Sequence, residues 1–207
     1  MTRVIGMALM AGGALAASGC LQMDTAHRLY LSPAGSLEWT VQQTDVRSDI
    51  EQAAGRLEEE GRFLSEAETG THPVARALQT LGADRLRTEL LRRERPFALV
   101  TTGEFGRADA VANRMIEQLG LDGRAALTSQ DGKTTLTLIV RLAGNEDAYD
   151  GDLTALLEDL PQYRIVLTGG RFVAAEGFVL SADGAVATPV SPDDADGEIR
   201  FSLTWAE

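Results

Sequence analysis

The chain of 207 residues has one cysteine, Cys20, and no apolar run of 18 or more residues. A single cysteine excludes an internal disulfide, so the folded part must rely on its apolar core for stability. A transmembrane helix needs about 20 mostly apolar residues, so we expect no transmembrane helix. Cys20 must therefore serve some purpose other than pairing within the chain.

Side chains for nucleophilic and metal chemistry are scarce. The two histidines are His27 and His72, and no Gly-x-Ser-x-Gly or Gly-x-Gly-x-x-Gly motif is present. The sole lysine, Lys133, has Gln130 three positions before it, which excludes a Ser-x-x-Lys motif. We expect His27 to be a structural residue at a sheet edge and His72 to lie in a loop. The sequence thus predicts a protein without catalytic residues, cofactor or zinc site.

Two acidic loops are the candidates for a calcium site, because calcium prefers closely spaced oxygen ligands. The first contains Asn145, Asp147, Asp150 and Asp152, and the second contains Asp193, Asp194, Asp196 and Glu198. Neither has the full EF-hand spacing, so we interpret both as solvated loops and expect no metal. A pair of carboxylates could also catalyse hydrolysis, but 31 acidic residues give no reason to single out one pair.

The formal net charge of −12 argues against functions that need a basic surface, such as binding of nucleic acid. Such a charge repels phosphate backbones and anionic headgroups, so we expect no nucleic-acid partner. The densest basic cluster is Arg92, Arg93 and Arg95, which we interpret as a charged hairpin tip.

The first 20 residues, MTRVIGMALMAGGALAASGC, have the layout of an export signal. Arg3 gives a positive start, residues 4–17 are apolar or small, and Ser18 and Gly19 precede Cys20. The segment Ala17-Ser18-Gly19-Cys20 resembles the lipobox of bacterial lipoproteins, although Ala17 stands where leucine is favoured. The resemblance implies that the cysteine receives a diacylglycerol, that cleavage occurs before it, and that acyl chains such as palmitate hold the protein on a membrane.

The same resemblance predicts the cellular address and the division of the chain. Residue 21 is leucine and not aspartate, which by the sorting habit of enterobacterial lipoproteins favours the outer membrane, facing the periplasm. We expect a lipoprotein signal peptide over residues 1–19, a short tether over residues 20–24 and a single α+β domain over residues 25–207.

Alternating apolar and polar residues predict successive β-hairpins. Residues 27–31 and 37–41 flank a Ser-Pro-Ala-Gly turn, residues 86–91 and 97–101 form a second pair, and residues 124–128 and 134–142 flank Asp131-Gly132. Trp39 and Trp205 fall on apolar strand faces, so we expect core packing for both rather than a sugar-stacking platform.

Apolar residues at helical spacing predict helices between these hairpins. The first would start at Asp49 as its cap, with an apolar stripe of Ile50, Ala54, Leu57, Gly61 and Leu64 and with Glu58, Glu59 and Glu60 facing solvent. Two more are predicted over residues 73–81 and 107–119, closed by Gly82 and Gly120. A short fourth helix is predicted after Asp152.

The remaining segments are strand-like and complete the fold class. Residues 163–168 and 172–180 are separated by Gly169-Gly170, and residues 199–205 alternate to the end. We predict an α+β fold with an antiparallel, twisted sheet built from successive hairpins and helices on one face. A hairpin soon after the anchor is also similar to mycobacterial-type lipoproteins, a resemblance of layout that implies no particular function.

Three hypotheses for function follow. The first is an outer-membrane-anchored lipoprotein whose non-catalytic domain binds another envelope protein or organises the envelope. The second is a carrier or sensor of an apolar ligand, with a cavity lined by residues such as Leu138, Val140, Leu157 and Phe178. The third is an envelope hydrolase that uses paired carboxylates. An enclosed apolar pocket would favour the second hypothesis, and a contiguous exposed apolar patch would favour the first.

Overall fold

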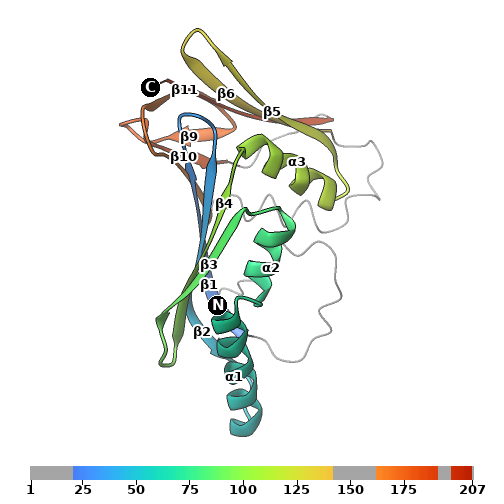
Figure 1. Ribbon diagram of the computed structural model, residues 1–207, viewed down its shortest axis with the longest axis vertical. Coiled ribbons are helices and arrows are strands. Elements are labelled where there is room, and N and C mark those ends of the chain that lie inside the picture. The colour runs from blue at the N-terminus through green and yellow to red at the C-terminus, as the bar shows by residue number, and fades with distance from the viewer. Residues whose placement is uncertain (1–20, 142–161, 191–196, 207) are drawn as a thin grey trace.

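A computed structural model describes residues 21–141, 162–190 and 197–206 (Figure 1). Strands β1 (Leu21–Leu31) and β2 (Leu37–Ser48) form the first predicted hairpin, with Leu31 opposite Leu37. The hairpin is longer than predicted. Residues 21–24, which we expected in a tether, belong to β1, because Leu21 already lies opposite Ser48 in the β1–β2 ladder.

The second and third hairpins are confirmed. β3 (Arg85–Arg92) pairs with β4 (Phe97–Phe105), and β5 (Asp122–Gln130) pairs with β6 (Lys133–Arg141). The turn between β5 and β6 has positive φ angles at Asp131 (52°) and Gly132 (72°). Asp-Gly suits such a turn because both residue types tolerate the left-handed conformation.

Three helices occur where the sequence predicts them, namely α1 (Ala53–Thr69), α2 (Pro73–Thr80) and α3 (Ala108–Gln118). The predicted start of α1 is wrong. Gln52, and not Asp49, is the residue before the first turn. The reason is local: the Ser48 hydroxyl accepts a hydrogen bond from the Ile50 amide at 3.2 Å, which holds this segment in a non-helical turn.

The predicted buried face of α1 is wrong in part, although Leu64 of the predicted stripe does pack against the core. Leu57 is 69% exposed, whereas Glu59 and Glu60 are buried beside Phe63 and Ala67. The two apolar residues pack against a small core cluster that includes Val46, Phe97 and Leu99. Burial of the large Phe63 ring determines which face of α1 turns toward the sheet. The smaller apolar residues of the predicted stripe contribute less to this orientation.

The buried Glu60 carboxylate is satisfied by neighbouring groups. Its Oε1 accepts a hydrogen bond from the Ser48 amide at 3.1 Å and lies 3.0 Å from Nε of Arg95. Arg95 also donates to the Ser48 carbonyl oxygen at 3.2 Å. A carboxylate with a charged partner and an amide donor can be buried without a large desolvation penalty, which allows this face of α1 to turn inward.

The C-terminal strand-like segments form β-strands where the structure describes them. They are β7 (Tyr163–Leu167), β8 (Arg171–Glu176), β9 (Phe178–Leu180), β10 (Val186–Pro189) and β11 (Glu198–Ala206). β7 pairs in parallel with β1 and antiparallel with β10, whereas β8 pairs with β11. The segment over residues 172–180, expected as one strand-like run, is therefore divided: β8 pairs in one sheet with β11, and β9 pairs with β10 in the sheet that contains β7.

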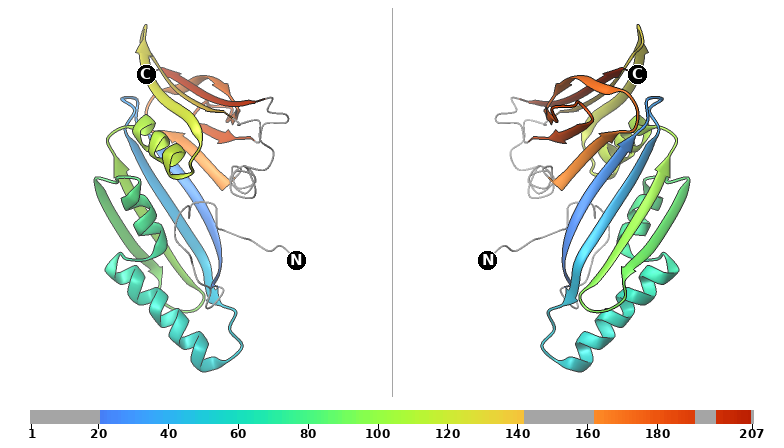
Figure 2. Two further views of the ribbon diagram at one scale, coloured as in Figure 1. Left: turned by 90° about the vertical axis from the view of Figure 1, so that its right-hand side faces the viewer. Right: turned by 90° about the vertical axis from the view of Figure 1, so that its left-hand side faces the viewer.

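The strands form two sheets, of order β3-β4-β2-β1-β7-β10-β9 and β5-β6-β11-β8. Figure 2 shows α1 and α2 along one face of the large sheet, and Figure 1 shows α3 and the small sheet at the end opposite α1. The α+β class and its antiparallel, helix-covered sheet are confirmed, with two sheets instead of one. The main core lies between the sheets and includes Trp39, Trp205, Leu31 and Leu203, each no more than 1% exposed.

Candidate functional site

An apolar cavity of about 210 Å³ lies between the two sheets and α3. The large sheet supplies one wall and the small sheet the facing wall, and α3 together with Leu121 closes a side. All of the lining residues are apolar or aromatic: Leu29, Leu31, Leu37, Trp39, Ala108, Val111, Ala112, Met115, Leu121, Leu136, Leu138, Val140, Tyr163, Ile165, Phe178, Pro189, Ile199, Phe201 and Leu203. None of the described residues that line the cavity is charged.

Strand periodicity explains why so many apolar residues meet there. Alternate residues of a strand point to the same face of a sheet. Leu136, Leu138 and Val140 of β6 therefore face inward together, and so do Leu29 and Leu31 of β1. The cavity lies between the apolar face of the large sheet and the apolar face of the small sheet. At one side α3 lies between the two sheets and keeps their faces apart.

The cavity is larger than packing defects in ordinary protein cores. An engineered apolar cavity of about 150 Å³ stays free of water and binds benzene. Leu29, Leu138 and Phe178 are only half-buried, so their apolar surface is available for contact with an occupant.

Two aromatic residues that line the cavity, Trp39 and Tyr163, contact the ring of His27. The Trp39 indole donates a hydrogen bond from Nε1 to Nδ1 of His27 at 3.2 Å, and the His27 ring stacks on Tyr163 with ring centroids 4.4 Å apart. Burial lowers the pKa of His27 to about 4. The imidazole is therefore neutral near pH 7. The predicted edge position of His27 is wrong, because β1 lies between β2 and β7.

His72 has a structural environment remote from the cavity. It is fully buried before α2, and its Nε2 lies 2.9 Å from Thr101 Oγ1 and 3.1 Å from Thr88 Oγ1. Nδ1 finds no hydrogen-bond partner among the described residues. Burial, with the charge of Arg76 as a smaller cause, lowers the pKa of His72 to about 4. The predicted loop residue is thus part of the packing between α2 and the large sheet.

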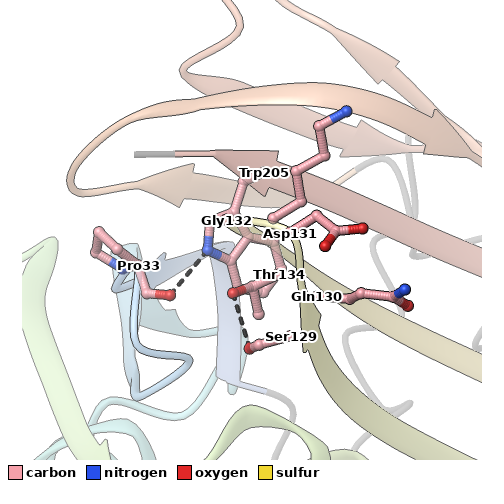
Figure 3. A pocket seen from close by; sticks show the side chains of 8 residues that line it. Pro33, Ser129, Gln130, Asp131, Gly132, Thr134 and Trp205 are labelled. Carbon is pink, nitrogen blue, oxygen red and sulfur yellow. Dashed lines mark hydrogen bonds between the residues drawn. The ribbon is translucent and has the colours of Figure 1, made fainter.

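A second hollow, of about 340 Å³, lies beside the β5–β6 turn (Figure 3). It is lined mainly by polar residues of that turn together with Pro33 and Trp205. Trp205 donates from Nε1 to the Pro33 carbonyl oxygen at 3.0 Å and is only 1% exposed. Because the indole presents no free face, this hollow lacks a stacking platform for a sugar, and the core role predicted for Trp205 is confirmed.

The structure brings together three of the four residues that the sequence suggested for an apolar site. Leu138, Val140 and Phe178 all line the inter-sheet cavity. Leu157 lies outside the described residues, as does Cys20. Trp39, Tyr163 and the α3 residues were not predicted to line it. The apolar spacing of the strand residues and of the α3 residues predicted that they would be buried. It did not predict that they would lie near β6.

The metal candidates are largely outside the described part of the chain. The whole first acidic loop and the predicted helix after Asp152 lie outside the described residues. In the second loop the same is true of Asp193, Asp194 and Asp196, whereas Glu198 is the first residue of β11. Among the residues that the structure does describe, no group of three or more histidine, cysteine, aspartate or glutamate side chains is placed to hold a metal. Within the same residues, no helix has the length and hydropathy to span a membrane.

Comparisons with known proteins give one structural likeness. No protein-family profile matches the chain, and no curated protein matches it in sequence. The folded domain of the LppM protein of Mycobacterium tuberculosis, solved by NMR, is similar with a TM-score of 0.40 and 10% sequence identity. The matched region covers 94% of this chain and 95% of that domain.

Proposed function

We propose that this protein is a lipid-anchored protein of the bacterial envelope whose domain binds an apolar ligand in the inter-sheet cavity. The observation that carries the proposal is that every described residue lining the cavity is apolar or aromatic. Of the three hypotheses from the sequence, this geometry favours the carrier or sensor over the partner-binding module and the hydrolase.

The shape of the cavity defines the class of ligand. Its volume of about 210 Å³ suits a small hydrocarbon or one medium-length alkyl chain, and is too small for a whole phospholipid. Because the described lining residues are all apolar or aromatic, a polar headgroup would remain outside, since its burial among them would leave it without partners. The ligand is therefore a hydrocarbon or an amphiphile that inserts a single chain.

Trp39 provides a direct reporter of occupancy, because its indole lines the cavity. In a Trp205→Phe variant it is the only indole, since the chain has two tryptophans. Bromine quenches indole fluorescence at contact range. Titration with bromobenzene or bromodecanoic acid should quench Trp39 emission to a saturating value.

A matched pair of substitutions on α3 tests whether the quencher enters the cavity. Ala112 lines the cavity, whereas Ala110 is exposed on the same helix. Ala112→Leu should weaken binding by about tenfold or more, equivalent to about 1.4 kcal/mol, and Ala110→Leu should not change it. Quenching that does not saturate, or that both variants alter equally, would exclude the cavity as the binding site.

The proposed anchor is tested separately at Cys20. Radiolabelled palmitate should enter the wild-type protein in cells and should be absent from a Cys20→Ser variant, which remains an unlipidated precursor. Fractionation of the wild-type protein should recover it with outer membranes. An intact mass that shows an unmodified cysteine, or a different mature start, would refute the anchor without affecting the cavity measurement.

A further inference from the structure

The two ends of strand β1 lie far apart in the molecule. Leu21 pairs with Ser48 near the start of α1, whereas Leu29 and Leu31 reach the cavity at the end that carries α3 and the small sheet (Figure 1). A strand rises about 3.3 Å per residue, so the eight steps from Leu21 to Leu29 span about 26 Å. The cavity is therefore remote from the residue that follows Cys20.

Little chain separates Cys20 from the folded domain. Leu21, the next residue, is already in the β1–β2 ladder, and Leu21 and Met23 pack against the core cluster that contains Val46 and Phe63. A lipid on Cys20 would thus draw this end of the domain directly to the bilayer, because no flexible tether allows it to move away.

We call this region the anchor end and define it by Leu21, Ser48, Leu57, Leu91 and the turn over residues 92–96. Arg95 of that turn donates to the Ser48 carbonyl oxygen, which places the turn beside the start of β1. Leu57 is 69% exposed and Leu91 is 52% exposed. Exposed leucines at this end can enter the interfacial region of a bilayer, where their burial is favourable.

The arginines of the anchor end already have acidic partners. Arg95 lies 3.0 Å from Glu60, Arg92 lies 3.9 Å from Asp45, and Arg93 pairs with Glu68. Attraction to anionic headgroups is weakened by these pairs, so contact with the bilayer should depend on the Cys20 lipid and the leucines more than on lipid charge.

We propose that the anchor end rests on the bilayer that holds the lipid of Cys20, and that the cavity is thereby held away from that bilayer. This inference rests on the proposed anchor. It implies that ligand enters the cavity from the aqueous side and not from the hydrocarbon of the anchoring membrane.

The test couples the mature chain, residues 20–207, through its sole thiol to maleimide-headgroup lipid in phosphatidylcholine vesicles with brominated acyl chains. Coupling replaces native lipidation, so the result does not depend on processing in cells. A tryptophan added by Leu57→Trp at the anchor end should be quenched relative to vesicles without bromine. Emission from Trp39 and Trp205 in the wild-type chain should be unchanged.

Val179→Trp provides the matched control. Val179 is 61% exposed on β9, close to the exposure of Leu57, but lies on the strand that contributes Phe178 to the cavity. Emission from this added tryptophan should not change, and adding anionic lipid should alter neither result. Quenching of Val179→Trp, or absence of quenching in Leu57→Trp, would overturn the inference. Binding of bromodecanoic acid measured without vesicles reports separately on the cavity.

Discussion

The Nε1 group of Trp39 donates a hydrogen bond to Nδ1 of His27, 3.2 Å away, and this contact requires Nδ1 to be unprotonated. The proton of the neutral ring is then on Nε2. The imidazole also stacks on Tyr163, so it contacts two of the aromatic residues that line the cavity. One pair of residues in neighbouring strands thus links the position of a cavity-lining indole to the ionisation state of a histidine.

Stability should fall as the pH is lowered from about 7 to 5. The folded-state pKa of His27 and of His72 is about 4, below the ordinary value of 6.5, so the unfolded chain binds more protons in this window. Each imidazole then contributes stability that is present above pH 6.5 and is lost on acidification, about 2 kcal/mol by pH 5. Urea unfolding at the two pH values measures this loss.

A His27→Phe variant should have a smaller decrease over the same pH range. Phenylalanine keeps a ring against Tyr163 but does not titrate. An undiminished decrease in this variant would show that His27 is not the source of the effect.

Filling the cavity should stabilise the ligand-free protein. Ala112→Leu adds apolar atoms to a space that is otherwise empty, and we expect the free energy of unfolding to rise by up to about 2 kcal/mol. Ala110→Leu on the exposed side of α3 should change it by less than about 0.5 kcal/mol. Denaturant midpoints for the two variants provide the comparison, and a destabilised Ala112→Leu would indicate that this part of the wall is already closely packed.

The buried glutamate of α1 should matter far more than its exposed neighbour. Glu60→Ala leaves the Ser48 amide without its acceptor and Arg95 without its ion pair, and should lower the free energy of unfolding by about 1–3 kcal/mol. Glu58 is exposed on the same helix, so Glu58→Ala should have an effect within about 0.5 kcal/mol. Equal effects in chemical denaturation would contradict the orientation of α1.

Gly177 should tolerate no side chain at the point where the chain passes from one sheet to the other. Its φ is +74°, and an added Cβ would overlap the Phe201 ring and lie 3.2 Å from the Arg200 carbonyl oxygen. Gly177→Ala should therefore destabilise by about 3 kcal/mol or more, from backbone strain and overpacking together.

Gly132 supplies the control, because its φ is +72° and an added Cβ would meet nothing within 4 Å. Gly132→Ala should lower stability only by the backbone strain of about 1–2 kcal/mol. Thermal unfolding of both variants separates the backbone strain, which both share, from the steric overlap with Phe201, which affects only Gly177→Ala. Similar losses of stability in the two variants would argue against close packing of Phe201 on Gly177.

Local patterns in the sequence were sufficient for the elements that depend on near neighbours. The alternation of Leu37, Trp39 and Val41 and the Asp131-Gly132 turn identified their hairpins correctly, because side-chain period and turn chemistry act over a few residues. The same reasoning failed for α1. Its rotation depends on Phe63 meeting β2 and β4, and on Arg95 and Ser48 accommodating a buried glutamate.

By itself, therefore, the sequence determined the fold class, most of the helices and strands, and the scarcity of catalytic groups. The tertiary structure decided which strands share a sheet and where a cavity forms. Leu29 lies opposite Ile165, 136 positions along the chain, and no local pattern specifies such a parallel pairing. Because the cavity is the space left between two sheets that each satisfy their own backbone hydrogen bonds, it exists only once those distant pairings are made.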